Sequence, residues 1–168
     1  MNSPTPSAAT AVTTAPFSIP VDPRFAWSRE FAASEWSGPN ARLSARTRLT
    51  MACWQGDVDA ASRVLDKLVD NAVKHTVTAG VGPVQVRLYI SEIGTLLIEV
   101  DDLDPQFADF ASVLAGGPTA SGSPLGGLWW VQERYKAQLS YYVRTGDDGE
   151  LLGKTVQALM EPERGRAG

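Results

Sequence analysis

Cysteine and histidine are almost absent from this sequence. Among its 168 residues there is one cysteine, Cys53, and one histidine, His75. A single cysteine excludes an intramolecular disulfide and a cysteine-based metal site. A single histidine excludes a zinc site that is built from two or more histidines. Disulfide-stapled domains and histidine-based zinc enzymes are therefore ruled out.

Long apolar runs and an excess of basic charge are also missing. No stretch approaches the roughly 18 consecutive apolar residues that a membrane-spanning helix needs. The first residues have neither the basic start nor the apolar core of a secretory signal, so we expect a cytoplasmic protein without membrane contact. The formal net charge is −4, whereas a nucleic-acid-binding protein needs a basic surface that neutralises phosphates. Direct binding to nucleic acid is therefore not expected.

What remains is a composition typical of one globular domain. Hydrophobic residues make up 43% of the chain and charged residues 20%, which is enough apolar material to build a core. Residues 1–16 carry no charged side chain and show no periodicity, so we interpret them as a disordered tail. We expect the folded domain to span residues 17–162, with a second short tail at residues 163–168.

The first half of this domain has helical patterns. Asp22-Pro23, followed by Phe25, Phe31 and Trp36, suggests a short helix. Residues 38–40 (GPN) then interrupt, and a second helix is predicted over residues 41–54. A third helix starts at Val58 and ends near His75. Its apolar residues recur at three- and four-residue steps, the spacing of one helix face: Val58, Ala61, Leu65, Leu68 and Ala72.

The second half has strand patterns. Residues 84–90 alternate between apolar and polar side chains, as in a strand with one exposed face. A turn at Gly94 leads to a more buried strand, residues 95–100, which ends at Asp101-Asp102. The remaining predicted elements are a glycine-rich loop (116–127), a helix (128–135), and two strands (137–144 and 154–160) joined by a turn at 146–149. This order predicts an α+β fold, a two-layer sandwich with a mostly antiparallel mixed sheet and helices on one face.

Four spaced segments resemble a known family. They are LDKLVDNAVKH (Leu65–His75), IEVDDLDP (Ile98–Pro105), SPLGGLWWV (Ser123–Val131) and GKTVQALM (Gly153–Met160). Their order and spacing are similar to those of the histidine-kinase-like (GHKL) ATP-binding fold, over roughly residues 17–162. Within that fold they resemble most the bacterial anti-sigma factors that are serine protein kinases. The resemblance implies ATP and Mg²⁺ as cofactors.

The resemblance also implies roles for particular residues. Asn71 matches the asparagine that holds Mg²⁺, and an amide oxygen is a suitable ligand for that ion. Asp102 matches the aspartate that reads adenine, with Asp101 one place away as an alternative register. Gly126, Gly127 and Leu128 match the glycine-rich motif beside the phosphates, where amide groups at a helix start favour anions.

Three departures from the family pattern affect the expected catalysis. Lys67 stands where the family has the glutamate that acts as general base, and an ordinary lysine cannot take a proton from a serine hydroxyl. Asp70 shares the helix face of Lys67 and is the alternative general base. Leu103 follows Asp102 in place of a small residue, and Leu125 replaces the first glycine of the phosphate motif. Because phosphoryl transfer depends on positioning and charge stabilisation, we expect weak or absent kinase activity.

Each of these residues also has a simpler interpretation. Asn71 could be a half-buried polar residue of a helix, and Asp102 could merely end a strand. Lys67 could be solvated, contact a phosphate, or pair with Asp70. Trp129 and Trp130 point about 100° apart on a helix, so one of them is expected to be exposed and available for a protein interface.

Three functions are consistent with the sequence. The first is a partner-binding regulator of the anti-sigma factor type, with ATP and Mg²⁺ as structural ligands. The second is an active ATP-dependent serine kinase in which Asp70 or water replaces the base. The third is a nucleotide-free interaction module. The resemblance implies a sigma factor or an anti-sigma antagonist as partner, and a homodimer as the oligomeric state.

Overall fold

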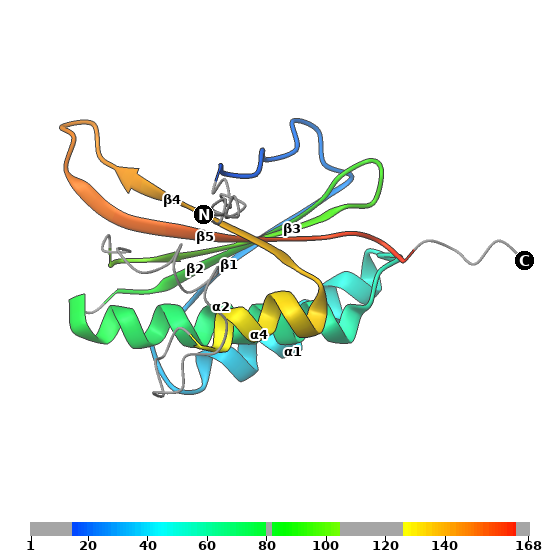
Figure 1. Ribbon diagram of the computed structural model, residues 1–168, viewed down its shortest axis with the longest axis horizontal. Helices are drawn as coiled ribbons and strands as arrows, with labels where there is room; N and C mark the ends of the chain where they lie inside the picture. Colours follow the sequence, from blue (N-terminus) through cyan, green and yellow to red (C-terminus); the bar gives the residue numbers. More distant parts are fainter. Residues whose placement is uncertain (1–14, 80–81, 105–125, 164–168) are drawn as a thin grey trace, which may run out of the picture.

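The fold is seen in a computed structural model, which describes residues 15–79, 82–104 and 126–163 (Figure 1). No helix in these three ranges is long and apolar enough to cross a membrane. The elements are, in chain order, β1 (Phe25–Phe31), α1 (Ser37–Met51), α2 (Val58–Ala79), β2 (Val84–Ile90), β3 (Leu96–Asp102), α4 (Gly126–Tyr135), β4 (Gln138–Thr145) and β5 (Leu151–Met160).

The strands form one five-stranded sheet with the order β1-β2-β3-β5-β4. Every neighbouring pair is antiparallel. The three helices cover one face of this sheet, as Figure 1 shows. The predicted two-layer α+β architecture is therefore confirmed, although the described strands contain no parallel pair and the sheet is antiparallel rather than mixed.

Helix α2 is the central element of the core. Its first turn is capped by Asp57, whose Oδ1 accepts a hydrogen bond of 2.9 Å from the backbone N–H of Ala60. The predicted apolar stripe is buried: Ala61, Leu65, Leu68 and Ala72 are each exposed by no more than 2%. This stripe packs against the apolar face of β2, β3 and β5. The helix continues to Ala79, beyond the predicted end near His75.

The predicted first helix is wrong, because Phe25–Phe31 forms the edge strand β1. The register pairs Phe25 with Ile90 and Phe31 with Val84, so every second residue of β1 faces the helix layer. Aromatic side chains suit this pleated, half-buried position. The helical interpretation rested on Asp22-Pro23 as a helix start and overlooked this alternation.

Helix α1 begins at Ser37, four residues earlier than predicted, and ends at Met51. Gly38-Pro39-Asn40 was interpreted as an interruption, but these residues form the first turn of the helix. Proline is tolerated there because the first N–H groups of a helix have no partner within the helix.

The other predicted elements appear with small shifts at their ends. The strand 84–90 has the predicted bounds, and β3 extends to Asp102. The turn between β4 and β5 lies at the predicted place and is closed by a 2.9 Å hydrogen bond from the N–H of Gly149 to the carbonyl of Gly146. Residues 1–14, 164–168 and most of the predicted glycine-rich loop lie outside the described residues.

A buried polar network occupies the face of the sheet opposite the helices. Arg87 bonds Glu99 at 3.0 Å and Asp101 at 2.9 Å, and these bonds raise the pKa of the guanidinium against the opposing effect of burial. Thr155 donates to Asp101 at 2.6 Å, and Gln157 donates to Glu99 at 2.9 Å. Buried charges need such partners, because an unpaired charge in an apolar environment is strongly unfavourable.

Gln157 also binds the N-terminal segment, residues 15–17. Its Oε1 accepts from the N–H of Phe17 at 2.7 Å, and its Nε2 donates to the carbonyl of Phe17 at 3.0 Å. The hydroxyl of Ser140 donates to the carbonyl of Ala15 at 2.9 Å. The backbone of this segment is therefore held on the face of the sheet opposite α1, α2 and α4.

Gly153 provides a test of how closely β3 and β5 approach. Its φ is +137°, and a Cβ there would lie 2.1 Å from the carbonyl oxygen of Asp102. We expect Gly153→Ala to lower the free energy of unfolding by roughly 3 kcal/mol or more, because backbone must move. Denaturant unfolding measures this change.

Gly149→Ala is the matched control. Gly149 also has a positive φ, +79°, but a Cβ there would meet nothing within 4 Å. Only the left-handed backbone is then penalised, at about 1–2 kcal/mol. Equal losses in the two variants would contradict the close approach of the strands at Gly153.

Candidate functional site

Asn71 and Asp102 lie toward the same end of the helix–sheet interface. Trp54, just before α2, donates a 2.8 Å hydrogen bond to the carbonyl of Gly94, just before β3. From this contact α2 and β3 run in the same direction (Figure 1). Helical rise places Asn71 about 20 Å from Val58, and strand rise places Asp102 about 20 Å from Leu96. The implied Mg²⁺ residue and the implied adenine residue are thus at similar depth.

Asn71 has an unsatisfied acceptor. The residue is 5% exposed, and its Oδ1 is buried without a hydrogen-bond partner in the described structure. Leaving a buried acceptor without a donor costs about 1–3 kcal/mol. A cation or a donor brought by a ligand would remove that penalty, so Asn71 fits the role of a Mg²⁺ ligand.

Asp102 is already neutralised by a lysine of β5. The Nζ atom of Lys154 lies 2.8 Å from Oδ2 and 3.0 Å from Oδ1 of Asp102. Asp102 is 1% exposed and Lys154 0%. Burial lowers the pKa of Lys154, and the hydrogen bond to Asp102 opposes that shift. The ammonium also donates to the carbonyl of Asp104 at 2.9 Å, so its position is fixed from two sides.

This pair does not fit adenine recognition. Reading the exocyclic amine requires a carboxylate oxygen that faces the ligand. Both oxygens of Asp102 contact Lys154, and Oδ1 also accepts from the N–H of Asp104 at 2.9 Å. Asp101, the alternative in register, takes part in the network on the opposite face with Arg87 and Thr155. Thus Asn71 has a buried oxygen without a partner in the described residues, whereas the carboxylates of Asp101 and Asp102 are both engaged in ion pairs.

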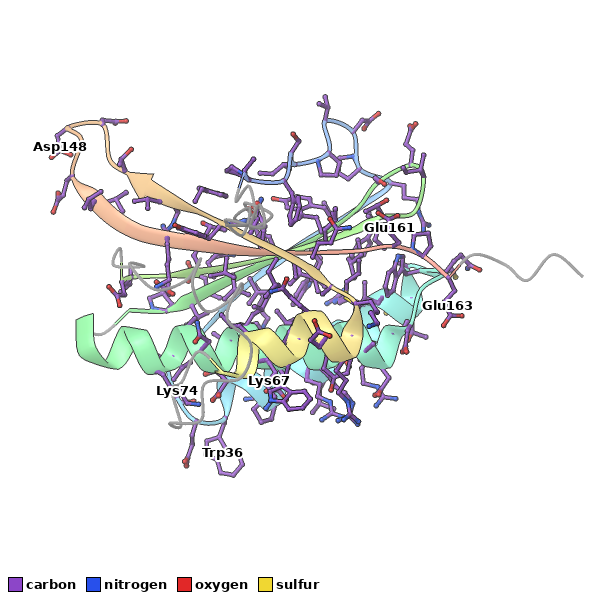
Figure 2. All side chains as sticks on the ribbon, viewed as in Figure 1. Trp36, Lys67, Lys74, Asp148, Glu161 and Glu163 are labelled. Atoms are coloured by element: carbon purple, nitrogen blue, oxygen red, sulfur yellow. The ribbon has the colours of Figure 1, made fainter. Side chains whose placement is uncertain are left out.

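Lys67 and Asp70 lie on the outer side of α2. Lys67 is exposed and points away from the sheet (Figure 2). Asp70 pairs with Lys74 at 2.8 Å rather than with Lys67, and this exposed pair contributes little to stability. Lys67 has no ion pair within the described residues. Asp66, next to it, is partly buried, and burial raises the pKa of its carboxyl.

The glycine-rich motif leads into α4. This helix begins at Gly126-Gly127, and the loop before it, with Leu125, lies outside the described residues. Leu128 is 1% exposed and belongs to the hydrophobic core, so its side chain is not available to a ligand. The amide groups of Gly126 and Gly127 as phosphate donors remain a prediction. Trp130 is 55% exposed, as expected for one member of the tryptophan pair.

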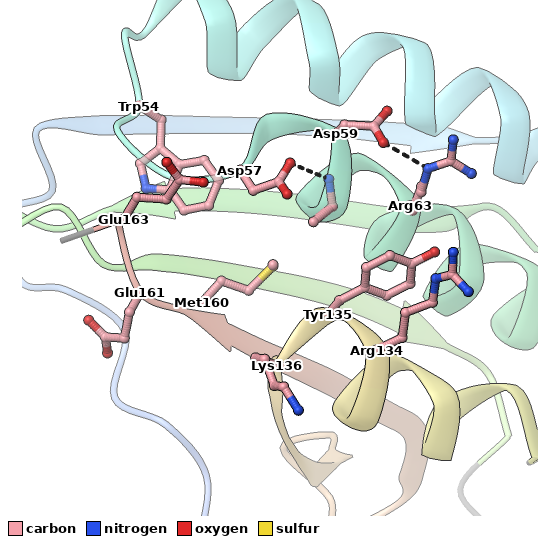
Figure 3. A pocket seen from close by; sticks show the side chains of 11 residues that line it. Trp54, Asp57, Asp59, Arg63, Arg134, Tyr135, Lys136, Met160, Glu161 and Glu163 are labelled. Carbon is pink, nitrogen blue, oxygen red and sulfur yellow. Dashed lines mark hydrogen bonds and ion pairs between the residues drawn. The ribbon is translucent and has the colours of Figure 1, made fainter. Parts of the chain in front are cut away.

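Two adjoining pockets lie between α2 and α4, and sequence reasoning did not find them. The first has a volume of about 570 Å³ and a lining of mixed charge, shown in Figure 3. The second, which we call the α2–α4 pocket, has a volume of about 430 Å³. Its lining residues are Arg63, Lys67, Trp130, Val131, Arg134 and Tyr135. The four-residue spacing of Arg63 to Lys67 and of Trp130 to Arg134 is the one signal in the sequence that could have indicated it.

Comparison with known proteins supports the fold. No model of a known protein family matches the sequence, and no curated protein matches it significantly. A chain in the crystal structure of the SiaB–SiaC complex from Pseudomonas aeruginosa has a similar structure, with a TM-score of 0.56 and 13% sequence identity. The match covers 80% of the present chain and 89% of that chain. At this identity the similarity shows a shared fold.

The buried Asp102–Lys154 pair can be tested by double-mutant analysis. We expect Lys154→Met to destabilise the protein by about 3–5 kcal/mol, because it leaves a buried carboxylate without its cation. Combining it with Asp102→Asn removes both charges and should recover most of that loss. Urea unfolding of the single and double variants measures the coupling. Additive losses would show that the two side chains do not interact.

Proposed function

We propose that this chain is a cytoplasmic regulatory protein of the anti-sigma factor/serine kinase type that acts by binding a partner protein, with weak or absent kinase activity. The four motifs in register support that family. The fold supports it as well, since a similar chain is part of a complex of two proteins. A sigma factor or an anti-sigma antagonist is the proposed partner, and a homodimer the proposed assembly.

The observation that carries this proposal is the buried Asp102–Lys154 pair. A kinase that uses ATP must hold adenine in a defined position, and the matched carboxylate is occupied by Lys154. The pair also supports the interpretation that this end of the interface stabilises the fold. Protein binding does not require the adenine contact, so it is the activity least affected by this departure.

The residues at the position of the general base support the same proposal. The side chain of Lys67 is exposed, and no carboxylate among the described residues forms an ion pair with it. Asp70 points to solvent and is paired with Lys74. A general base must lie within hydrogen-bond reach of the hydroxyl that it deprotonates. The competing kinase hypothesis therefore has no described residue suited to this role.

A second function, in which ATP and Mg²⁺ are structural ligands, is favoured by one observation. The buried Oδ1 of Asn71 lacks a donor or cation in the described residues. If a nucleotide binds, we propose that it is held through its metal and phosphates, by Asn71 and the amide groups near Gly126, without recognition of adenine by Asp102. If Asn71 is only a structural residue of its helix, the chain is a nucleotide-free interaction module.

Calorimetric titration with ATP and with ADP, each with Mg²⁺, tests the proposal. We expect affinity weaker than about 1 mM for the wild-type chain. Any residual binding should disappear in Asn71→Ala and persist in the Asp102→Asn, Lys154→Met double variant. Lys67→Glu restores the residue type of the resembled family and should leave phosphotransfer to a purified sigma factor or antagonist undetectable.

Two outcomes would contradict the proposal. The first is micromolar ATP binding that the double variant abolishes, because Asp102 would then read adenine. The second is phosphotransfer by the wild-type chain. Circular dichroism of each variant serves as the control, so that a lost signal is assigned to the site only when the variant is folded.

A further inference from the structure

Basic and aromatic side chains gather at the α2–α4 pocket defined above, on the side of the molecule that faces away from the sheet. Helix α2 contributes Arg63 and Lys67, and α4 contributes Trp130 and Arg134. Residues four apart lie one above the other on a helix surface, so each helix presents a short row. The two rows face one another across the pocket.

The charge of this pocket is of one sign. Three cations line it, Arg63, Lys67 and Arg134, and no lining residue is acidic. Arg63 pairs with the carboxylate of Asp59 at 2.9 Å, and both side chains are more than 40% exposed. Lys67 has no such pair among the described residues. The whole chain has a net charge of −4, whereas the lining of this pocket is positive. The local positive charge favours an anionic partner.

The pocket also has an apolar component. Val131 is fully buried at its floor, whereas the indole of Trp130 is 55% exposed at its edge. Arg134 lies over the ring of Tyr135, 5.9 Å from its centroid. Figure 3 shows Arg63, Arg134 and Tyr135 close together where α2 and α4 meet. Tryptophan, tyrosine and arginine are the residues most enriched among those that dominate protein-binding energy.

We propose that the α2–α4 pocket binds an acidic segment of a partner protein in which carboxylates are interspersed with aromatic side chains. The carboxylates pair with Lys67, Arg63 and Arg134, and an aromatic ring packs on the exposed indole of Trp130. A volume of about 430 Å³ admits a few side chains of such a segment. This inference deepens the proposed function and rests on its partner-binding part. It gives Lys67, at the position of the family's base, a role in recognition.

A random copolymer of glutamate and tyrosine is a suitable probe, because it presents carboxylates and aromatic rings in many local arrangements. Fluorescence anisotropy of the labelled copolymer measures its binding to the full chain. We expect saturable binding that weakens as salt is raised. Lys67→Glu and Arg134→Glu should each reduce affinity at least tenfold, and Trp130→Ala at least threefold.

Lys74→Glu is the matched control. Lys74 lies two turns further along α2, is exposed, and is outside the pocket. It changes the net charge as much as Lys67→Glu does, and it should alter affinity less than twofold. Equal losses of affinity in Lys67→Glu and Lys74→Glu would show that binding depends on net charge alone and would overturn the proposal. Absence of binding by the wild-type chain, or equal binding of a lysine–tyrosine copolymer, would overturn it as well.

The last measurement is whether ATP with Mg²⁺ displaces the labelled copolymer from the protein. Competition at micromolar nucleotide would assign the pocket to a phosphate-bearing small molecule, which overturns the protein-segment proposal. This result differs from failure of the proposed function, which is read from phosphotransfer and from adenine binding at Asp102. A chain that phosphorylates its partner and still binds the copolymer through Lys67 would refute the proposed function alone.

Discussion

The packing of α2 against the apolar face of β2, β3 and β5 is the contact on which the rest of the structure depends. Its stripe of small and branched apolar side chains lets the helix lie close to the sheet along its length. That contact sets Asn71 and Asp102 at similar depth, and it leaves the opposite side of α2, with Lys67, facing outward. Helix α4 then packs beside α2, and the pocket between the two helices follows from this arrangement.

Adjacent carboxylates on β3 belong to separate buried networks. Asp101 faces the side of the sheet opposite α1, α2 and α4 with Arg87 and Thr155, whereas Asp102 faces the helix layer with Lys154. Because successive residues of a strand point to opposite faces, one dipeptide anchors charges on both sides of the sheet. Both carboxylates are engaged within the fold. The cationic and aromatic side chains that line the α2–α4 pocket take part in neither network.

Periodicity predicted the parts of the fold in which one face is consistently apolar. Helix α2 and strand β2 were found for this reason, whereas β1 was missed because its inward side chains include Arg29 between aromatic residues. In the site, the resemblance named Asn71 and Asp102, whose proposed roles stay predictions. The partner of Asp102 could not, since Lys154 is 52 residues away and no local pattern joins them. The α2–α4 pocket likewise combines helices that are distant in the chain.

The hydrogen bonds between Gln157 and the N-terminal segment, residues 15–17, have a consequence for how that segment can change over evolution. Within the N-terminal segment, the hydrogen bonds of the Gln157 amide go to main-chain atoms of Phe17, and that of Ser140 goes to the carbonyl of Ala15. These contacts impose no requirement on the identity of the side chains they hold, apart from the N–H that proline lacks. These hydrogen bonds from β4 and β5 can therefore hold the backbone of the segment on the sheet while its side chains change.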